Sequence, residues 1–199
     1  MSNYVIGLTG GIACGKTNLS NALRNMGVPV IDADEISRSL TAPGGDALPL
    51  IRKAFGDSVF DGEILDRKKL GAKVFSDPEA LETLNQITHP LIFQKMKAEM
   101  NRHEGPVVLD VPLLFETGLD QWCQEIWCAY LPQKEQVKRL MARDGLSRRA
   151  AMQRIHSQMP ALQKKRKAHQ VIDTRGSREE SAAKVLSLWR DKIQQLKEK

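Results

Sequence analysis

A glycine-rich segment near the start of the chain limits the possible folds more than any other part of the sequence. Gly10 is followed by four residues and then by Gly15, Lys16 and Thr17, which matches the pattern G-x-x-x-x-G-K-[ST] of a phosphate-binding P-loop. The apolar residues before the loop (4–8) are predicted to form a short buried strand, and the residues after it a helix. This arrangement directs free backbone N–H groups and the positive end of the helix dipole at an anion, so the chain is expected to bind phosphate.

The residues assigned to the phosphate site are those of the loop itself. Lys16 is placed to reach the β- and γ-phosphates, and the Thr17 hydroxyl is a candidate ligand of Mg²⁺. The residues expected to bind the nucleotide are Gly11, Ile12, Ala13, Cys14, Gly15, Lys16 and Thr17. Cys14 has two interpretations. Loop N–H groups that lower the pKa of its thiol would make it a redox switch; the favoured alternative is a small tolerated loop residue.

The basic balance of the chain is compatible with several classes of partner. Its 30 Lys and Arg against 24 Asp and Glu give a net charge of +6, which suits nucleic acid, a membrane surface or a polyphosphate substrate. The excess lies between Lys134 and Arg175, a segment without aromatic side chains on which bases would stack. No apolar run reaches the length of a membrane span. We therefore expect a polyphosphate substrate, and neither nucleic acid nor a membrane as partner.

The N-terminal segment and the cysteines indicate the cellular compartment of the protein. The N-terminus enters the first predicted strand without a leader segment. The three cysteines are an odd number, which argues against a disulfide framework. A cytoplasmic protein is expected.

Predicted strands and helices alternate along the 199 residues. Strands are predicted at 4–8, 27–32, 107–114, 125–131 and 170–173. This alternation indicates an α/β fold of the P-loop kinase type, with a doubly wound five-stranded parallel sheet. The chain is expected to divide into a nucleotide-binding core, 1–42 and 106–199, and a helical substrate-binding lobe, 43–105. A lid is expected at about 139–160.

Acidic residues follow the second predicted strand and lie in the third, beside the crevice where parallel sheets bind ligands. Asp32 and Asp34 are two residues apart and are favoured as carboxylates that face the ligand. The alternative is that they cap the next helix and interact with its dipole. Asp110 resembles the acidic strand residue that supports Mg²⁺ in P-loop proteins.

The region between the second and third strands is predicted to be mainly helical. A helix is expected at 66–75, and another begins near Ser76 with a proline in its first turn. The segment 88–90 is expected to break the chain and open a further helix. His89 in this segment either points to a ligand or has a structural role, and the sequence favours neither interpretation.

The basic segment is predicted to form short helices that act as a lid. Arg139 and Arg143 are four residues apart on one helix face, so both are expected to point inward, and Arg154 lies on the next helix. Guanidinium groups bind phosphate oxygens bidentately and stay charged near pH 7. They suit a lid that excludes water and spreads charge in phosphoryl transfer. The lysine-rich run 164–167 is expected to be a solvated helix face.

A set of ordered motifs runs along almost the whole chain. They are Gly7-Leu8-Thr9-Gly10-Gly11-Ile12 with Gly15-Lys16-Thr17, Asp32-Ala33-Asp34, Leu84 with His89-Pro90-Leu91-Ile92, Val111-Pro112-Leu113-Leu114-Phe115-Glu116, Arg139-Leu140, Ala142-Arg143-Asp144, Leu146-Ser147, Arg154-Ile155, Ser157-Gln158 and Val171-Ile172-Asp173. Together they resemble the dephospho-coenzyme A (dephospho-CoA) kinase family. The resemblance implies ATP-dependent phosphorylation of the ribose 3′-hydroxyl of dephospho-CoA, the last step of coenzyme A (CoA) synthesis.

The resemblance also implies cofactors, partners and residue roles. ATP and Mg²⁺ are the implied cofactors, dephospho-CoA and ATP are the implied partners, and a monomer or weak homo-oligomer is expected. The implied catalytic residues are Lys16, Asp32 and Arg143; the substrate-binding residues are Asp34, His89, Pro90 and Leu114; the lid residues are Arg139, Arg143 and Arg154; and the metal ligands are Thr17, Asp34 and Asp110. Which of Asp32 and Asp34 is the base stays open.

The chain departs from the usual pattern of this family at three places. Ala13-Cys14 stands where Gly-Ser is usual, His169 stands where Asp is usual, and Thr174 stands where Asn is usual. Ala13 is expected to have an ordinary, negative φ, whereas a glycine at this position would not be restricted to one. The departures are expected to bear on adenine-side contacts and nucleotide preference.

Two alternative functions are kept. A P-loop NTPase that regulates or binds nucleic acid would use the basic segment. The chain has no Asn-Lys-x-Asp guanine signature, and its formal match to a D-x-x-G switch, 173–176, lies too late in the sequence. A nucleoside monophosphate kinase or a shikimate-type kinase is the nearer alternative, and it differs in its acceptor.

Overall fold

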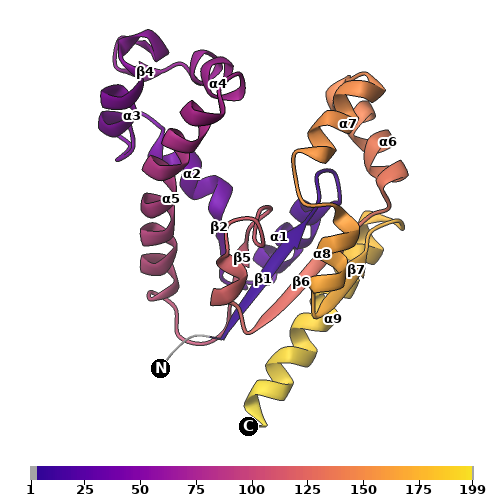
Figure 1. Cartoon of the computed structure of the whole chain (residues 1–199). Coiled ribbons are helices and arrows are strands. Elements are labelled where there is room, and N and C mark those ends of the chain that lie inside the picture. The colour runs from indigo at the N-terminus through magenta and orange to yellow at the C-terminus, as the bar shows by residue number, and fades with distance from the viewer. Residues whose placement is uncertain (1–3, 199) are drawn as a thin grey trace. The chain divides into compact units, whose positions relative to one another are not determined.

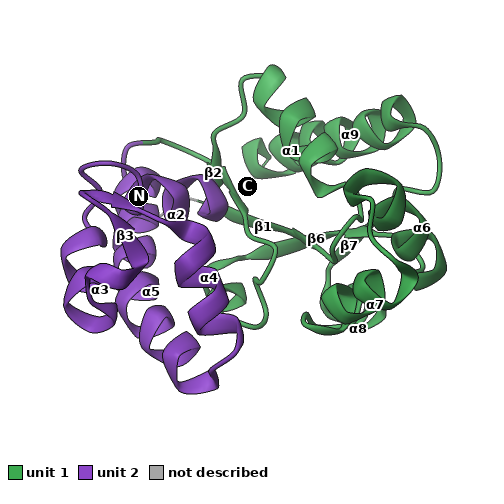
Figure 2. Cartoon of the chain, turned by 90° about the horizontal axis from the view of Figure 1, so that it is seen from above, with its two compact units in different colours: residues 1–31, 103–199 green, residues 32–102 purple. Residues whose placement is uncertain are grey.

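The computed structural model of the chain describes residues 4–198. The chain divides into two compact units, coloured green and purple in Figure 2. Unit 1 has the residues up to Ile31 and those from His103 on, and unit 2 has Asp32–Arg102. Within the described residues, no helix combines the length and the apolar character that crossing a membrane requires.

Unit 1 is built on a five-stranded sheet with the strand order β2-β5-β1-β6-β7 (Figure 1). The strands are β1 (Val5–Gly10), β2 (Val30–Asp32), β5 (Val107–Asp110), β6 (Glu125–Tyr130) and β7 (Gln170–Asp173). The pairs β1–β5, β1–β6 and β6–β7 are parallel. Every residue of β1 is buried, as expected for a parallel strand covered on both faces. The predicted doubly wound parallel sheet is confirmed.

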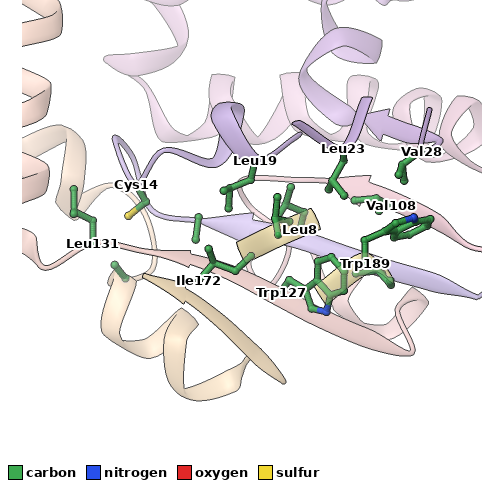
Figure 3. Packing of buried hydrophobic residues seen from close by; sticks show 14 residues of the cluster. Leu8, Cys14, Leu19, Leu23, Val28, Val108, Trp127, Leu131, Ile172 and Trp189 are labelled. Carbon is green, nitrogen blue, oxygen red and sulfur yellow. The ribbon is translucent and has the colours of Figure 1, made fainter. Parts of the chain in front are cut away.

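Helices cover both faces of this sheet (Figure 2). They are α1 (Lys16–Asn25), α6 (Gln133–Asp144), α7 (Arg148–His156), α8 (Ala161–Lys167) and α9 (Arg178–Lys197), with a 3₁₀ turn η2 (Leu119–Trp122). On one face Leu19 and Leu23 of α1 meet Leu8, Trp127 and Trp189 in the core (Figure 3). Burial of each such side chain contributes about 1.5–3 kcal/mol. On the other face α8 contacts β1 and β6.

Capping contacts explain where several helices of unit 1 begin and end. Ser147 accepts from the N–H of Ala150 at the start of α7, and Ser177 with Glu180 forms the predicted capping box of α9. Gly145 ends α6 with a φ of 66°, which glycine adopts without a Cβ clash. These predicted helix boundaries are confirmed.

Unit 2 is helical with one small hairpin. Its elements are α2 (Ala33–Leu40), α3 (Leu48–Phe55), η1 (Asp57–Val59), β3 (Phe60–Asp61), β4 (Ile64–Leu65), α4 (Arg67–Phe75) and α5 (Pro78–Met100). Leu40, Ile51 and Val74 from the first three α-helices lie in its core, and Leu91 of α5 packs against that core. Asp66 caps α4 by accepting from the N–H groups of its first turn, as predicted. The β3–β4 hairpin was not predicted.

Helix α5 shows that the break expected at 88–90 is wrong. The helix runs through this segment, with Pro90 inside it. Because proline has no N–H, the carbonyl of Gln86 lacks its helical hydrogen bond, at a cost of about 3 kcal/mol. Apolar side chains such as Leu84 and Leu91, which pack against the core of unit 2, offset this cost.

Candidate active site

The P-loop joins β1 to α1 and reverses the chain between Gly11 and Cys14, whose N–H donates to the Gly11 carbonyl (3.1 Å). A Cβ built on Gly10 would lie 2.8 Å from the carbonyl oxygen of Ala129 in β6, so the two strands approach this closely only without a side chain. Gly15, with a φ of 79°, is the N-cap of α1. The first N–H groups of α1 have no helical acceptor, so they are available to an anion, as the P-loop pattern predicts.

Ala13 adopts a left-handed conformation, so the expectation of an ordinary φ is wrong. Its φ is 60°, and among residues 4–198 it is the one residue other than glycine with a positive φ. It is the third residue of the turn from Gly11 to Cys14, where a type II turn requires a positive φ. The conformation costs an L-residue about 1–2 kcal/mol, so the geometry of the loop overrides the preference of alanine.

Side chains from outside the loop hold its carbonyl groups. Gln136 of α6 donates from Nε2 to the carbonyl of Ile12 (2.7 Å), and Thr174 donates from Oγ1 to that of Cys14 (2.8 Å). Arg139 donates from Nη2 to the carbonyl of Thr174 (2.5 Å). These contacts hold the loop carbonyls toward α6 and the turn after β7. Sequence reasoning missed Gln136, whose partner is 124 positions away, and missed this role of Thr174.

Cys14 is a buried thiol of the loop. It is 1% exposed, and its Sγ accepts from Nε2 of Gln136 at 3.2 Å. Burial, only partly opposed by backbone hydrogen bonds, raises the pKa of this thiol to about 11. The net direction is therefore opposite to the lowered pKa that the redox-switch alternative requires. A thiol that is neutral at pH 7 is a poor nucleophile, which favours a small loop residue over a redox switch.

Lys16 and Asp110 form an ion pair at the carboxyl edge of the sheet. Nζ of Lys16 contacts Oδ1 of Asp110, and the two side chains are 13% and 1% exposed. Asp110 ends β5 and is paired with Leu8 of β1 in the sheet register, so the strand before the P-loop and the acidic strand are neighbours. The structure therefore brings these two predicted site residues into contact.

The predicted metal ligands of unit 1 are Thr17 and Asp110. Thr17 is exposed in the first turn of α1. Its hydroxyl and the Asp110 carboxylate are oxygen donors, the type that Mg²⁺ prefers, and Mg²⁺ takes further ligands from water and phosphate. Within residues 4–198 no three His, Cys, Asp or Glu side chains gather into a group that would hold a metal.

The predicted lid arginines have different partners. Arg139 lies beside the P-loop, where its Nη1 is 3.7 Å from a Cβ built on Gly15. Arg143 donates to Asp144 from Nε (2.7 Å) and Nη2 (3.2 Å), and Arg154 donates to the same carboxylate from Nη1 (2.9 Å). The hydrogen bond from Arg143 is the largest cause that lowers the pKa of Asp144. Arg139 and Arg143 thus do not share a partner, despite their i, i+4 spacing.

The predicted site residues of unit 2 lie on α2 and α5. Asp32 caps α2, because its Oδ1 accepts from the N–H groups of Asp34 (2.9 Å) and of the next residue (3.1 Å). Asp34 is exposed in the first turn of the helix. His89 is half-buried, and its ring stacks on Phe93 with centroids 5.7 Å apart. Pro90 is exposed. The capping alternative for Asp32 is thus realised, and it uses one carboxylate oxygen.

Leu114, expected to bind substrate, has its side chain in the core. It is fully buried, and its Cδ2 lies 2.8 Å from a Cβ built on Gly7. The glycine at this position of β1 therefore makes room for Leu114. The neighbouring Leu113 is 39% exposed, so its side chain is the better placed of the two to meet a ligand.

The solvated face that the sequence suggested for the lysine-rich run 164–167 is only partly present, because Arg166 and Lys167 are exposed and Lys164 is not. Lys164 is fully buried and pairs with Glu116, with Nζ 2.9 Å from Oε1. The ammonium groups of Lys165 and Lys167 lie over aromatic rings, at 4.5 and 4.9 Å from the ring centroids. The prediction failed for Lys164 because its partner comes from a distant part of the sequence.

His169 lies away from the P-loop. Its Nδ1 accepts from the N–H of Ile126 (3.0 Å) near the start of β6. Because β6 and β7 are parallel, this is the edge of the sheet opposite to the P-loop, which follows the end of β1. The expectation that His169 bears on adenine-side contacts is therefore wrong.

Comparisons with known proteins converge on one family. The sequence model of the family "Dephospho-CoA kinase" matches residues 4–180. A dephospho-CoA kinase of Carboxydothermus hydrogenoformans is 42% identical over 198 residues, which cover 94% of this chain and 96% of that protein.

Solved structures agree with the fold. The dephospho-CoA kinase from Campylobacter jejuni matches with a TM-score of 0.66 and 25% identity, over 96% of this chain and 98% of that one. A shikimate kinase from Acinetobacter baumannii has a TM-score of 0.51 and 16% identity, over 96% of this chain and 95% of that one. The P-loop kinase fold predicted from the sequence is confirmed.

Proposed function

The chain belongs to the dephospho-CoA kinase family, and we propose that it uses ATP to phosphorylate the 3′-hydroxyl of dephospho-CoA, which yields CoA and ADP. The family and its named relatives support a kinase of CoA biosynthesis. The observation within the molecule that carries the proposal is the P-loop whose Lys16 is paired with the buried Asp110. This pair places a cation and a carboxylate beside the helix N-terminus that binds phosphate.

The P-loop and the lid act on ATP in this proposal. The N–H groups of the loop and Lys16 bind the β- and γ-phosphates. Arg139 adds positive charge from beside the loop, and Arg143 and Arg154 exchange the Asp144 carboxylate for phosphate oxygens. The charge that develops on the transferred group is thereby spread over several cations, which lowers the barrier.

Mg²⁺ fits the oxygen donors at this edge of unit 1. Thr17 and Asp110 are its proposed ligands here, and Asp34 of unit 2 is proposed as a further one. When bound, Mg²⁺ neutralises charge on the β- and γ-phosphates. The contact of Asp110 with Lys16 keeps the carboxylate oriented for this role.

Unit 2 supplies the acceptor side in this proposal. Asp32 takes the proton of the attacking 3′-hydroxyl, as a carboxylate does in other kinases, and Asp34 helps to orient it; the reverse assignment is the alternative. His89 and Pro90, partly exposed on α5, contact the adenosine diphosphate portion of dephospho-CoA. The substrate lobe at 43–105 and the lid at about 139–160 belong to the same proposal.

We also propose that the enzyme works in the cytoplasm as a monomer or weak homo-oligomer. All of its cysteines are free, which fits a reducing compartment. The nucleic-acid alternative has one basic side chain fewer to draw on, because Lys164 is buried and does not form part of an exposed basic surface.

The choice of acceptor tests the proposed function. ADP release is measured at steady state with dephospho-CoA, adenosine, AMP and shikimate. We expect kcat/KM for dephospho-CoA to exceed that for each other acceptor by roughly a thousandfold, since a site built for one set of polar groups rejects analogues that lack them. A comparable kcat/KM for AMP or shikimate would contradict the proposal and indicate a monophosphate or shikimate-type kinase.

A further inference from the structure

An ion pair between a buried lysine and a partly exposed glutamate lies outside the residues assigned to the reaction; the side chain of Glu116 is 24% exposed. The side chain of Lys164 in α8 is 0% exposed, and its Nζ lies 2.9 Å from Oε1 and 3.1 Å from Oε2 of Glu116. A buried lysine is costly unless it is paired and hydrogen bonded, and apolar side chains of similar volume are often at least as stable in such a place. Stability alone therefore does not account for this pair.

The pair joins three segments of unit 1. Nζ of Lys164 also donates to the carbonyl of Pro112 (2.5 Å), which accepts a second hydrogen bond from Oγ1 of Thr9 (3.0 Å). Oε1 of Glu116 accepts from the N–H of Met159 (2.9 Å). The cluster thus connects the end of β1, the segment after β5, and the linker between α7 and α8.

Each of these segments leads directly to the proposed active site. Thr9 precedes the P-loop, and Pro112 follows Asp110, the partner of Lys16. Met159 follows α7, the helix that carries Arg154. The buried ammonium group of Lys164, with its partner Glu116, therefore links the segment that follows α7 to the segment that follows Asp110.

We propose that Lys164 and Glu116 are positioning residues for phosphoryl transfer: they form the fixed joint that holds the lid helices in register with the Lys16–Asp110 edge. The inference rests on the proposed function, because the lid acts on ATP in that proposal. Neither residue touches the reacting groups. The pair acts through the Pro112 carbonyl on one side and through the Met159 amide on the other.

A double substitution separates positioning from simple stabilisation. Lys164→Met leaves the Glu116 carboxylate without its partner and is expected to lower Tm. Lys164→Met combined with Glu116→Gln removes both charges, and Gln still offers an oxygen to Met159, so Tm is expected to return close to the wild-type value. Because nothing then holds the Pro112 carbonyl from α8, kcat is expected to stay at least about tenfold low. KM for ATP is expected to change by less than about threefold, since the P-loop itself is intact.

The matched control is Arg166→Met, which removes a cation from an exposed position of the same helix. We expect wild-type Tm and kcat for this variant. A double variant that regains both Tm and kcat would overturn the inference, because the pair would then be purely structural.

Amide hydrogen exchange tests the joint without any substrate. Met159 lies between α7 and α8, so its N–H owes its protection to Glu116. We expect slow exchange of this amide in the wild-type enzyme by NMR, and exchange at least about tenfold faster in Lys164→Met. Unprotected exchange in the wild type would overturn the inference even if no variant folds. Absence of dephospho-CoA-dependent ADP release by the wild type would contradict the proposed function instead, and is seen before any variant is compared.

Discussion

Two clusters of cations and carboxylates in unit 1 are proposed to meet the phosphates of ATP, and they differ in burial. The side chains of Lys16 and Asp110 are 13% and 1% exposed, whereas those of Arg143 and Arg154 are 59% and 54% exposed around Asp144. Removing one partner of the first cluster leaves a desolvated charge. The second cluster is screened by water, so its ion pairs are weak. The first is therefore a preformed part of the site, and the second is able to exchange partners.

The elements that carry the two clusters account for this difference. Lys16 begins α1 and Asp110 ends β5, an inner strand of the sheet. The lid cluster lies on α6 and α7, which share a small core of their own that includes Leu140 and Ala151. Ile12 of the P-loop packs against that core. The proposed lid is thus a small cluster of helices attached at the phosphate loop, with Arg143 and Arg154 exposed to solvent.

The largest effect is expected from Lys16→Ala. Turnover is expected to fall by a hundredfold or more, since a fixed cation on the transferred phosphate is lost. Because Asp110 keeps a buried charge without this partner, the free energy of unfolding is also expected to fall, by about 3 kcal/mol. ADP release and thermal unfolding measure the two effects.

The double variant Lys16→Met with Asp110→Asn is the control for this experiment. It removes both charges, so stability is expected to recover while turnover stays low. Near-normal turnover in either variant would contradict the role of Lys16. Unchanged stability in Lys16→Ala would contradict the contrast between a buried and an exposed cluster.

A smaller effect is expected from Arg143→Ala in the exposed cluster. Turnover is expected to fall by roughly tenfold to a hundredfold, because one cation on the phosphates is lost. The free energy of unfolding is expected to change by less than about 0.5 kcal/mol, as for other exposed ion pairs. Arg166→Met, in which another exposed arginine is removed, should change neither quantity. A loss of stability as large as that of Lys16→Ala would remove the distinction between the two clusters.

The sequence predicted those parts of the site whose chemistry is local. The spacing of Gly10, Gly15 and Lys16 requires no knowledge of the rest of the fold, and the capping residues Ser147 and Ser177 act within one helical turn. Strand alternation likewise predicted the sheet. Each of these features depends on neighbours a few residues away, which is why a linear pattern was enough.

The failures concern residues whose partners are distant in the sequence. The sequence pattern places Lys164 in a solvated run, but in the fold it pairs with Glu116, 48 positions away. Pro90 normally ends a helix, and only the packing of α5 against the core of unit 2 shows why it does not. At Cys14 burial likewise decides the pKa of the thiol, which agrees with the small loop residue that the sequence favoured. In each case tertiary burial outweighs the local preference.

The smallest effect is expected at Ala13, and it tests how rigidly the P-loop is held. Glycine adopts the left-handed φ of 60° without strain, but it also increases the entropy of the unfolded chain. The balance predicts that Ala13→Gly stabilises the protein by about 0.5–1 kcal/mol, which raises Tm by about 1–4 °C. Gly27 has a φ of 84° and no atom within 4 Å of an added Cβ. The reverse substitution there, Gly27→Ala, should destabilise the protein by a similar amount. Turnover should stay unchanged in Ala13→Gly, because Gln136 and Thr174 still hold the loop carbonyls. A fall in Tm as large as that of Gly27→Ala would contradict this prediction. It would show that the Ala13 side chain stabilises the loop by packing on the core shared by α6 and α7, and that hydrogen bonds alone do not hold the loop.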